Sequence, residues 1–355
     1  MTGDLPVAPW WKRRRMKILL LQLKRIGDLV LTTPAIATLR TSFPKAKLTL
    51  VVSSECAELL PAITSVDSVL MARRNLRDIA LFFSTAARRF DYCIDFTRND
   101  RSASLALLSG APRRVVSYRV REQSNTRACA YTDFINVRTR DMHTIDYNLA
   151  LLGPLGAREL STAPHLDLPQ LAYEKVDALR REWNVTKPYV VLHPGSARKE
   201  KLWEPGRWAE VIESFGRSNG IDLVLTSGSS SDEQAHIAAI KSKTQQQIVD
   251  LSGKTDLLTL AALIEQARLL VTVDSAPVHL AAATRTPQVI LFGPTNPFHW
   301  RPRGSPAVIL QGDSVAPVTE FSPVRPRFAM SQISTQRVIS AMDSLLATHL
   351  ATQPS

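Results

Sequence analysis

The stretch KILLLQLKRIGDLVLTTPAIATLR, residues 17–40, decides the fold. Its beginning, KILLLQL, is an apolar run typical of a buried strand, and its end has the apolar spacing of an amphipathic helix. A strand that leads straight into a helix is the repeating unit of parallel sheets. Lys24, Arg25 and Asp28 lie at the turn between the two, which Gly27 allows to be tight. Parallel sheets bind their ligands at this end of their strands.

The same alternation of strand and helix recurs through both halves of the chain. Strands are expected at residues 17–23, 47–53, 68–71, 91–95, 189–193, 221–226, 247–251, 269–273 and 288–292. Helices are expected at residues 28–42, 76–90, 102–108, 170–183, 205–218, 232–242, 257–267, 277–284 and 335–348. This pattern predicts an α/β protein whose parallel sheets are covered by helices.

An irregular stretch, RELSTAPHLDLP at residues 158–169, separates the two halves. We expect an N-terminal Rossmann-like domain at 16–168, a C-terminal one at 169–348, and a basic extension at 1–15. The proline-rich stretch before the last helix could carry that helix back to the first domain. Two such domains with their strand ends facing make an interdomain cleft, where ligands would bind.

Composition excludes several classes of protein. Of the 355 residues, 45% are hydrophobic and 21% are charged, so the chain can build large cores and is not a disordered polymer. No apolar run reaches the roughly 18 residues of a membrane-spanning helix. Cys56, Cys93 and Cys129 show no metal-ligand spacing and leave one thiol without a disulfide partner, which favours a reducing compartment such as the cytoplasm.

The chain is strongly basic, with a formal net charge of +12. This charge favours an anionic partner: nucleic acid, a membrane surface or a phosphorylated substrate. The sequence has no RNP, zinc-finger or helix-turn-helix pattern, so nucleic acid is not expected. Trp10 and Trp11 beside the basic residues 12–15 suit peripheral contact with an anionic bilayer. The alternative is that translation starts at Met16.

A first candidate site follows the predicted strand that ends at His193, in LHPGSARKEKLWEPGRW. The turn at Ser196 can direct backbone N–H groups and a hydroxyl toward an anion. Arg198, Lys199 and Lys201 add positive charge there. The pattern therefore indicates a phosphate site, with an ordinary loop as the alternative.

Two further strand ends carry polar groups. In LVLTSGSSSDEQ, Asp232 or Glu233 could accept hydrogen bonds from ribose hydroxyls. In VTVDSAPVHLAAATRTPQ, the strand ends at Asp274 and Ser275 is a plausible N-cap. The amides of Ser275, Ala276 and Val278 could then face a diphosphate. His279 lies one turn further on, where a packed core histidine is the alternative.

Missing motifs narrow the chemistry. No GxGxxG follows the first strand and no GxxxxGK[ST] occurs, which argues against a dehydrogenase and a P-loop NTPase. No Asp-x-Asp pair is available for a metal-bound nucleotide diphosphate. No HExxH motif or Cys/His cluster indicates zinc.

Together, KRIGDLVLTTPAIATLR, LHPGSARKEKLWEPGRWAEVI and VTVDSAPVHLAAATRTPQVILFGPTNP resemble glycosyltransferase family 9, the ADP-heptose:lipopolysaccharide heptosyltransferases. The likeness extends over nearly the whole chain from Met16, and LKRIGDLVLTTPAI is most similar to the heptosyltransferase III type. The resemblance implies a GT-B fold and inverting transfer of heptose from ADP-heptose, with no cofactor and no obligatory metal. Many relatives carry cysteines near the C-terminal end, whereas PVRPRFAMSQIS has none, so the subgroup stays open.

The resemblance also implies roles for individual residues. Asp28 would be the general base, and the alternative is that it serves only the start of its helix. Donor-binding residues would be Ser196, Lys201, Glu233, Asp274, Ser275, Ala276 and His279. Asp232, next to Glu233, leaves the ribose assignment open.

An anionic lipopolysaccharide inner core would be the acceptor, at the cytoplasmic face of the inner membrane. Lys24 and Arg25 are expected to help bind it, with Arg119 and Arg121 from the arginine-rich segment 112–127. The alternative for that segment is a disordered basic loop. The other functions left open are transfer from another nucleotide sugar or to another glycan, a non-catalytic nucleotide-sugar-binding protein, and an epimerase-like enzyme.

Overall fold

The chain folds into two compact units. The computed structural model describes residues 15–73, 78–158, 160–216, 220–317, 319–320 and 328–350, and the side chains of the last range to 348. Unit 1 comprises Met1–Thr139 and Ile145–Ser161, and unit 2 comprises Arg140–Thr144 and Thr162–Ser355. The expected basic extension lies outside the described residues except for Arg15, whose guanidinium pairs with Asp67 at 2.9 Å.

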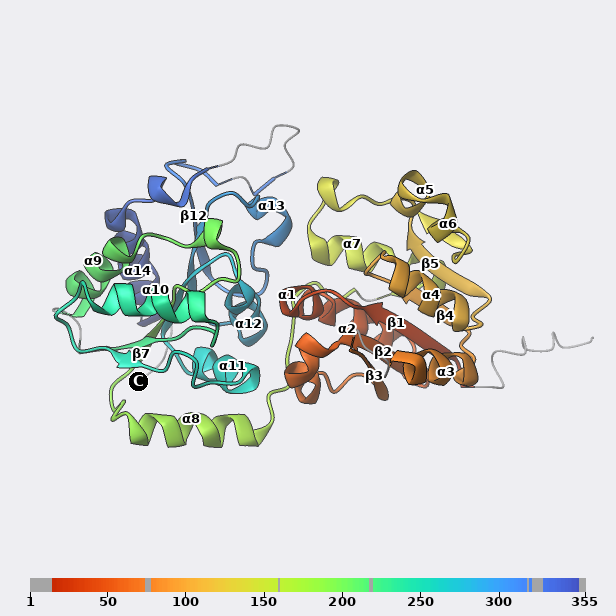
Figure 1. Ribbon diagram of the computed structural model, residues 1–355, viewed down its shortest axis with the longest axis horizontal. Coiled ribbons are helices and arrows are strands. Elements are labelled where there is room, and N and C mark those ends of the chain that lie inside the picture. The colour runs from red at the N-terminus through yellow and green to blue at the C-terminus, as the bar shows by residue number, and fades with distance from the viewer. Residues whose placement is uncertain are drawn as a thin grey trace, which may run out of the picture. The chain divides into compact units, whose positions relative to one another are not determined.

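Unit 1 is built on a parallel sheet of six strands in the order β3-β2-β1-β4-β5-β6. The strands are β1 (Lys17–Gln22), β2 (Lys47–Ser53), β3 (Ser68–Ala72), β4 (Tyr92–Asp95), β5 (Arg113–Ser117) and β6 (Asp133–Ile135). The helices are α1 (Ile26–Val30), α2 (Thr33–Ser42), α3 (Asp78–Arg88), α4 (Asp100–Leu108), α5 (Arg119–Gln123), α6 (Asn125–Ala128) and α7 (Thr144–Ala150) (Figure 1).

The core of unit 1 follows from the two-residue period of its strands. Leu19 and Leu21 of β1 point to one face, where they join Val51, Cys93 and residues of α3 and α4 in one buried cluster. Ile18 and Leu20 are equally buried but alternate to the opposite face. Both faces of β1 are therefore covered, as expected for a central parallel strand.

The helix expected at 28–42 is interrupted, and that prediction was wrong in detail. Pro34 lacks the N–H that would continue the ladder to the carbonyl of Val30. The Thr33 hydroxyl donates to that carbonyl instead, at 2.8 Å. Thr32 likewise donates its hydroxyl to the carbonyl of Asp28 at 2.7 Å. Two helices therefore replace one, and the short α1 carries Asp28 in its first turn.

The arginine-rich segment 112–127 is folded, which overturns the alternative of a disordered loop. It supplies β5, α5 and α6. Arg113 donates to both carboxylate oxygens of Asp133 at 3.0 Å, and this contact lowers the pKa of that carboxyl. Arg127 donates to Asp100 at 2.9 Å. Much of the positive charge in this segment therefore holds unit 1 together.

Unit 2 repeats the architecture with the strand order β12-β11-β10-β7-β8-β9, again parallel. Its strands are β7 (Tyr189–His193), β8 (Asp222–Leu225), β9 (Val249–Asp250), β10 (Leu269–Val273), β11 (Gln288–Phe292) and β12 (Ala307–Gln311). Its helices are α8 (Gln170–Glu182), α9 (Pro205–Gly216), α10 (Ser231–Lys241), α11 (Leu257–Glu265), α12 (Ala276–Thr284), α13 (Pro297–Trp300) and α14 (Thr335–Leu350). The expected α/β class with two parallel sheets is confirmed.

The last helix, α14, belongs to unit 2. Its residues Val338, Met342 and Leu346 join a buried cluster with Trp203 and Trp208. The Trp203 indole N–H donates to the carbonyl of Ile333, just before the helix, at 3.1 Å. The apolar face of this helix is therefore buried on the second sheet.

No helix within the described ranges combines the length and the apolar character needed to cross a bilayer.

Replacing Met342 by alanine should lower the free energy of unfolding by about 2–5 kcal/mol, because the side chain is fully buried and would leave a cavity. Urea unfolding measures the loss. Ser344→Ala, at an exposed position of the same helix, is the control and should change stability by no more than about 0.5 kcal/mol. Equal effects of the two substitutions would contradict the packing of α14.

Candidate functional site

In unit 2 the candidate residues gather at the carboxyl edge of the sheet. β7 lies between β10 and β8, and the chain runs outward from β7 to β9 before it returns to β10 on the other side. The place where β7 and β10 part is a topological switch point, at which open α/β sheets bind ligands. The loops after β7, β8 and β10 carry the residues that the sequence singled out.

Lys201 and Asp274 meet across this switch point. The Lys201 ammonium donates to a carboxylate oxygen of Asp274 at 2.5 Å and to its backbone carbonyl at 3.0 Å. The side chains are only 13% and 7% exposed, respectively. Two residues chosen separately from the sequence are thus brought together into one charged pair.

Glu233 lies between two glycines from different loops. A Cβ atom on Gly195 would lie 2.5 Å from a Glu233 carboxylate oxygen, and one on Gly228 would also overlap it. The other oxygen accepts a hydrogen bond from Ser230 at 2.8 Å. Asp232 is exposed instead and pairs with Lys199 at 3.1 Å. The sequence left these two acids undecided, and the geometry favours Glu233 as the one aimed at the edge.

The start of α12 forms another part of this edge. Ser275 is its N-cap, and the amides of the first helical turn have no intrahelical acceptor. The Val278 amide, however, donates to the carbonyl of Ser275 at 3.2 Å, so one of the three amides expected to face a diphosphate is engaged. His279 is 5% exposed, and its ring packs edge-on against Trp300. This burial and ring contact are what the alternative of a packed core histidine predicts.

Two more polar groups line the loop after β7. Ser196 is 8% exposed and its hydroxyl accepts a hydrogen bond from the Arg198 amide at 3.2 Å. His193 received no role from the sequence. Its ring lies 3.0 Å from the Thr226 hydroxyl, and burial lowers the pKa of this histidine to about 4. It is therefore neutral at physiological pH and can orient the strand end without adding charge.

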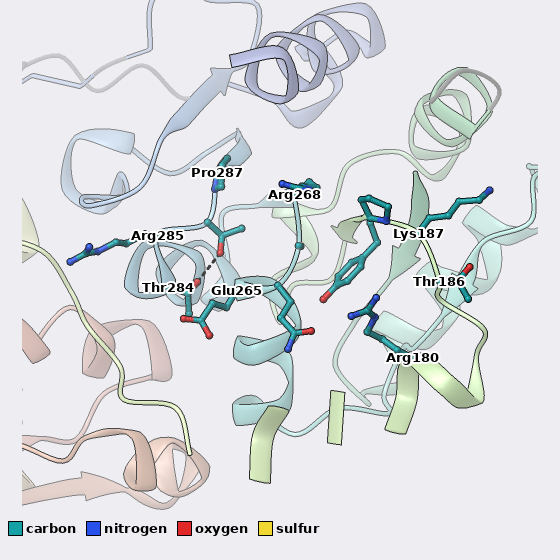
Figure 2. A pocket seen from close by; sticks show the side chains of 13 residues that line it. Arg180, Thr186, Lys187, Glu265, Arg268, Thr284, Arg285 and Pro287 are labelled. Atoms are coloured by element: carbon teal, nitrogen blue, oxygen red, sulfur yellow. Dashed lines mark hydrogen bonds between the residues drawn. The ribbon is translucent and has the colours of Figure 1, made fainter. Parts of the chain in front are cut away.

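A cavity of about 630 Å³ opens at the opposite edge of this sheet (Figure 2). Arg180, Lys187, Arg268 and Arg285 line it together with Glu265. The C-terminal ends of three helices, α8, α11 and α12, lie at this edge. Their last backbone carbonyls give the edge a partial negative charge. Cations at this edge are stabilised by that partial charge.

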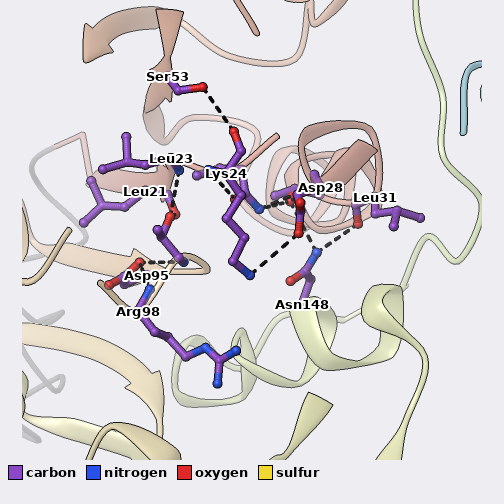
Figure 3. Close-up of polar contacts among 12 residues, drawn as sticks. Leu21, Leu23, Lys24, Asp28, Leu31, Ser53, Asp95, Arg98 and Asn148 are labelled. Atoms are coloured by element: carbon purple, nitrogen blue, oxygen red, sulfur yellow. Dashed lines mark hydrogen bonds and ion pairs between the residues drawn. The ribbon is translucent and has the colours of Figure 1, made fainter. Parts of the chain in front are cut away.

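Unit 1 has its own switch point, between β1 and β4, and the turn after β1 lies there. The Lys24 ammonium is 3.7 Å from an Asp28 carboxylate oxygen, with side chains 30% and 15% exposed (Figure 3). Burial lowers the pKa of Lys24, while the charge of Asp28 opposes that shift. The N-cap of α1 is Arg25, and no side chain caps the helix. Asp28 is thus a first-turn acid rather than a cap, and its carboxylate faces Lys24.

The other expected acceptor-binding residues have different environments. Arg25 is exposed and Arg119 is half-buried. The Arg121 guanidinium stacks 3.8 Å from the centroid of the Phe134 ring. The structure therefore places Lys24 and Asp28 together, whereas Arg121 is engaged in packing.

Asp95 is a residue that sequence reasoning missed. It ends β4 beside the switch point and is fully buried. One carboxylate oxygen accepts from the amides of Thr97 and Arg98, and the other from the hydroxyls of Ser102 and Tyr131. Burial raises the pKa of Asp95, and these hydrogen bonds oppose the rise. A polar residue ending a predicted strand was the signal that selected Asp274, and it would have selected Asp95 too.

The described part of the chain contains no group of three or more His, Cys, Asp or Glu side chains arranged to hold a metal ion.

Comparison with known proteins finds one family and the same fold. The sequence model described as glycosyltransferase family 9 (heptosyltransferase) matches residues 79–322. The chain is 29% identical to lipopolysaccharide heptosyltransferase 3 of Escherichia coli, over 90% of this chain and 96% of that protein.

Two solved structures are similar to this one. The glycosyl transferase family 9 protein of Veillonella parvula has a TM-score of 0.81 at 23% identity, covering 94% of this chain and 97% of that one. The E. coli ADP-heptose LPS heptosyltransferase II has a TM-score of 0.76 at 22% identity, covering 94% and 100%. These likenesses confirm the GT-B fold class expected from the sequence.

Lys201→Met should lower the free energy of unfolding by about 3–5 kcal/mol, because it leaves the buried Asp274 carboxylate without its cation. Adding Asp274→Asn should recover much of that loss. Lys175→Met, which breaks the exposed pair with Asp256, is the control and should cost about 1 kcal/mol or less. Urea unfolding measures all of them, and equal costs at both lysines would disprove the burial argument.

Stability should fall on acidification because of His193. Its folded-state pKa of about 4 lies below the unfolded value of 6.5, so its contribution is present above pH 6.5 and is lost as pH falls toward 4. The stability difference between wild type and His193→Asn should therefore shrink by about 3 kcal/mol across that window. Denaturant unfolding at several pH values measures it. A difference that does not change with pH would contradict a buried, neutral His193.

Proposed function

The chain belongs to glycosyltransferase family 9, and on that premise we propose that it transfers heptose from ADP-heptose to the inner core of lipopolysaccharide. The observation that carries the proposal is the buried Lys201–Asp274 pair at the switch point of unit 2. The name of the E. coli relative, lipopolysaccharide heptosyltransferase 3, supports the choice of substrate class.

The donor would bind at the carboxyl edge of unit 2, in the proposed C-terminal domain 169–348. Lys201 would contact the diphosphate, together with the amides of Ser275 and Ala276 at the start of α12. Glu233 would accept hydrogen bonds from the adenosine ribose. Ser196 and His279 would shape the site rather than carry charge, because both are buried and already packed.

The acceptor would bind at the carboxyl edge of unit 1, in the proposed domain 16–168. Asp28 would take the proton of the attacking hydroxyl as the new C–O bond forms. Direct attack on the anomeric carbon inverts its configuration and needs one base and no covalent intermediate. Lys201 and the helix amides would stabilise the charge on the departing ADP, so that no metal is required.

Lys24, Arg25 and Arg119 would bind the anionic acceptor. Arg121 would contribute less to acceptor binding than the sequence suggested, because its guanidinium stacks on the ring of Phe134. The excess of basic residues suits contact with the anionic cytoplasmic face of the inner membrane, where such an acceptor is made accessible. No nucleic-acid partner is proposed.

The proposal is tested by incubating the protein with ADP-heptose or other nucleotide sugars and core-truncated lipopolysaccharide, with and without EDTA. Mass spectrometry should show one added heptose in the presence of the chelator. Transfer from a different nucleotide sugar would replace the donor assignment. Product without acceptor would point to an epimerase, and binding without transfer to a non-catalytic protein.

Asp28→Asn should lower kcat by about 100-fold or more, because the amide cannot take the hydroxyl proton. The KM for ADP-heptose should stay unchanged, since the donor is proposed to bind unit 2. Initial rates by ADP release measure both constants.

Asp100→Asn is the matched control, because Asp100 is also a first-turn acid in unit 1, with a side chain that is 88% exposed. It should leave kcat unchanged. If Asp28→Asn retained full activity, the base assignment would be wrong.

A further inference from the structure

Arg98 is a second cation at the switch point of unit 1. It follows the end of β4 and has φ +67°, in the left-handed region that costs free energy for every residue but glycine. Such residues persist only where their surroundings hold them, and they cluster at functional sites. Glycine would adopt this backbone conformation at a lower cost in free energy, so a role for the arginine side chain is expected here.

The buried Asp95 carboxylate holds Arg98 in this conformation. One of its oxygens accepts the amide of Thr97 at 2.7 Å and the amide of Arg98 at 3.1 Å. Thr97 in turn ties this turn to β1, because its hydroxyl accepts from the Leu23 amide at 2.7 Å and donates to the carbonyl of Leu21. The loops after β1 and β4 are thereby fixed to each other, and with them Lys24 and Arg98.

The Arg98 side chain extends from this turn toward α7 (Figure 3). Its guanidinium carbon lies 5.2 Å from the centroid of the buried Tyr147 ring. Its Nε is buried and has no hydrogen-bond partner among the described residues. The charge of Arg98 adds to burial in lowering the pKa of Lys24, which shows that the two cations act on one another. Arg119 is the second cation whose charge reaches Tyr147.

Two cations, Lys24 and Arg98, share one accessible acid at this point, because Asp95 is fully buried. Within the described ranges no carboxylate forms an ion pair with Arg98, and the acid beside Lys24 is Asp28. The charge of Asp95 does raise the pKa of Lys24, but its oxygens already accept four hydrogen bonds, one from the backbone amide of Arg98 and none from the Arg98 guanidinium. Two neighbouring cations with one accessible acid leave room for an additional anion.

We propose that Arg98, together with Lys24, binds an oxyanion of the acceptor, a phosphate or a carboxylate, and so places the acceptor hydroxyl beside Asp28. This inference rests on the proposed function for the identity of the acceptor. Arg98 contacts the substrate, and Asp95 is a positioning residue that acts through Arg98. A planar guanidinium fork suits either oxyanion.

Arg98→Gly tests the proposal because glycine accepts the left-handed backbone, so that the variant should fold at least as well as the wild type. The KM for the lipopolysaccharide core should rise about ten-fold or more, with the KM for ADP-heptose unchanged. Arg98→Lys keeps the charge but not the fork and should restore part of the affinity.

Arg89→Gly is the matched control. Arg89 lies before β4, at the opposite edge of the same sheet, and is an exposed arginine with φ +45°. The substitution removes the same side chain from the same backbone region and should change neither KM. An Arg98→Gly enzyme that behaves like Arg89→Gly, or one in which the KM for ADP-heptose rises equally, would overturn the proposal.

Modified acceptors identify the oxyanion. If a phosphate is bound, the difference between wild type and Arg98→Gly should vanish with a chemically dephosphorylated core; if a carboxylate is bound, it should vanish with a carboxyl-amidated core. A difference that survives removal of both groups would overturn the proposal.

Calorimetric titration of the core acceptor without donor separates this inference from the proposed function. Weaker binding by Arg98→Gly supports the oxyanion site even if the wild type transfers no heptose, whereas equal binding refutes it even if transfer occurs.

Discussion

In a parallel sheet every strand delivers its carboxyl end to the same edge, and this constraint fixes the place of each candidate residue in both units. Ligands bind at this edge where the connections from two neighbouring strands lead away in opposite directions. The loops separate there and leave backbone groups accessible. β1 and β4 part in unit 1, and β7 and β10 part in unit 2. Lys24 follows β1, while Lys201 and Asp274 follow β7 and β10. The same topology thus produces two polar edges, each with a lysine–aspartate ion pair.

The two acids at these switch points show how hydrogen-bond donors, rather than burial, separate structural from functional groups. Asp95 and Asp274 are both buried and both lie at the end of a strand. Asp95 accepts hydrogen bonds from two amides and two hydroxyls, so its oxygens are occupied and it shapes the turn. Asp274 is held by the ammonium of one lysine, which a diphosphate can also attract. An acid at a strand end is therefore informative only together with its donors.

The elements were largely predictable from the sequence, because buried parallel strands are continuous apolar runs. The strands at 189–193, 269–273 and 288–292 have the expected bounds. The segment 112–127 was not predictable, since its arginines find acids and carbonyls that are distant in the sequence, such as Asp133. The choice between Asp232 and Glu233 was equally hidden, because it depends on glycines from two separate loops. The local sequence pattern predicts the strands and the residues at their ends. Contacts with residues from other loops decide which of those residues stay accessible to a ligand.

The net charge of the chain gives little guide to where an anion binds. Several arginines of unit 1 pair with acids or carbonyls within the fold, and those at the amino edge of unit 2 offset helix ends. What remains at the switch point of unit 1 is the Lys24–Asp28 pair, with the charge of Arg98 acting on Lys24. Lys24 now shares the carboxylate that the acceptor hydroxyl needs. An oxyanion held by Arg98 would attract the Lys24 ammonium away from Asp28, so that binding the correct acceptor would itself free the base. Charge at this edge would then select the acceptor and also time the proton transfer.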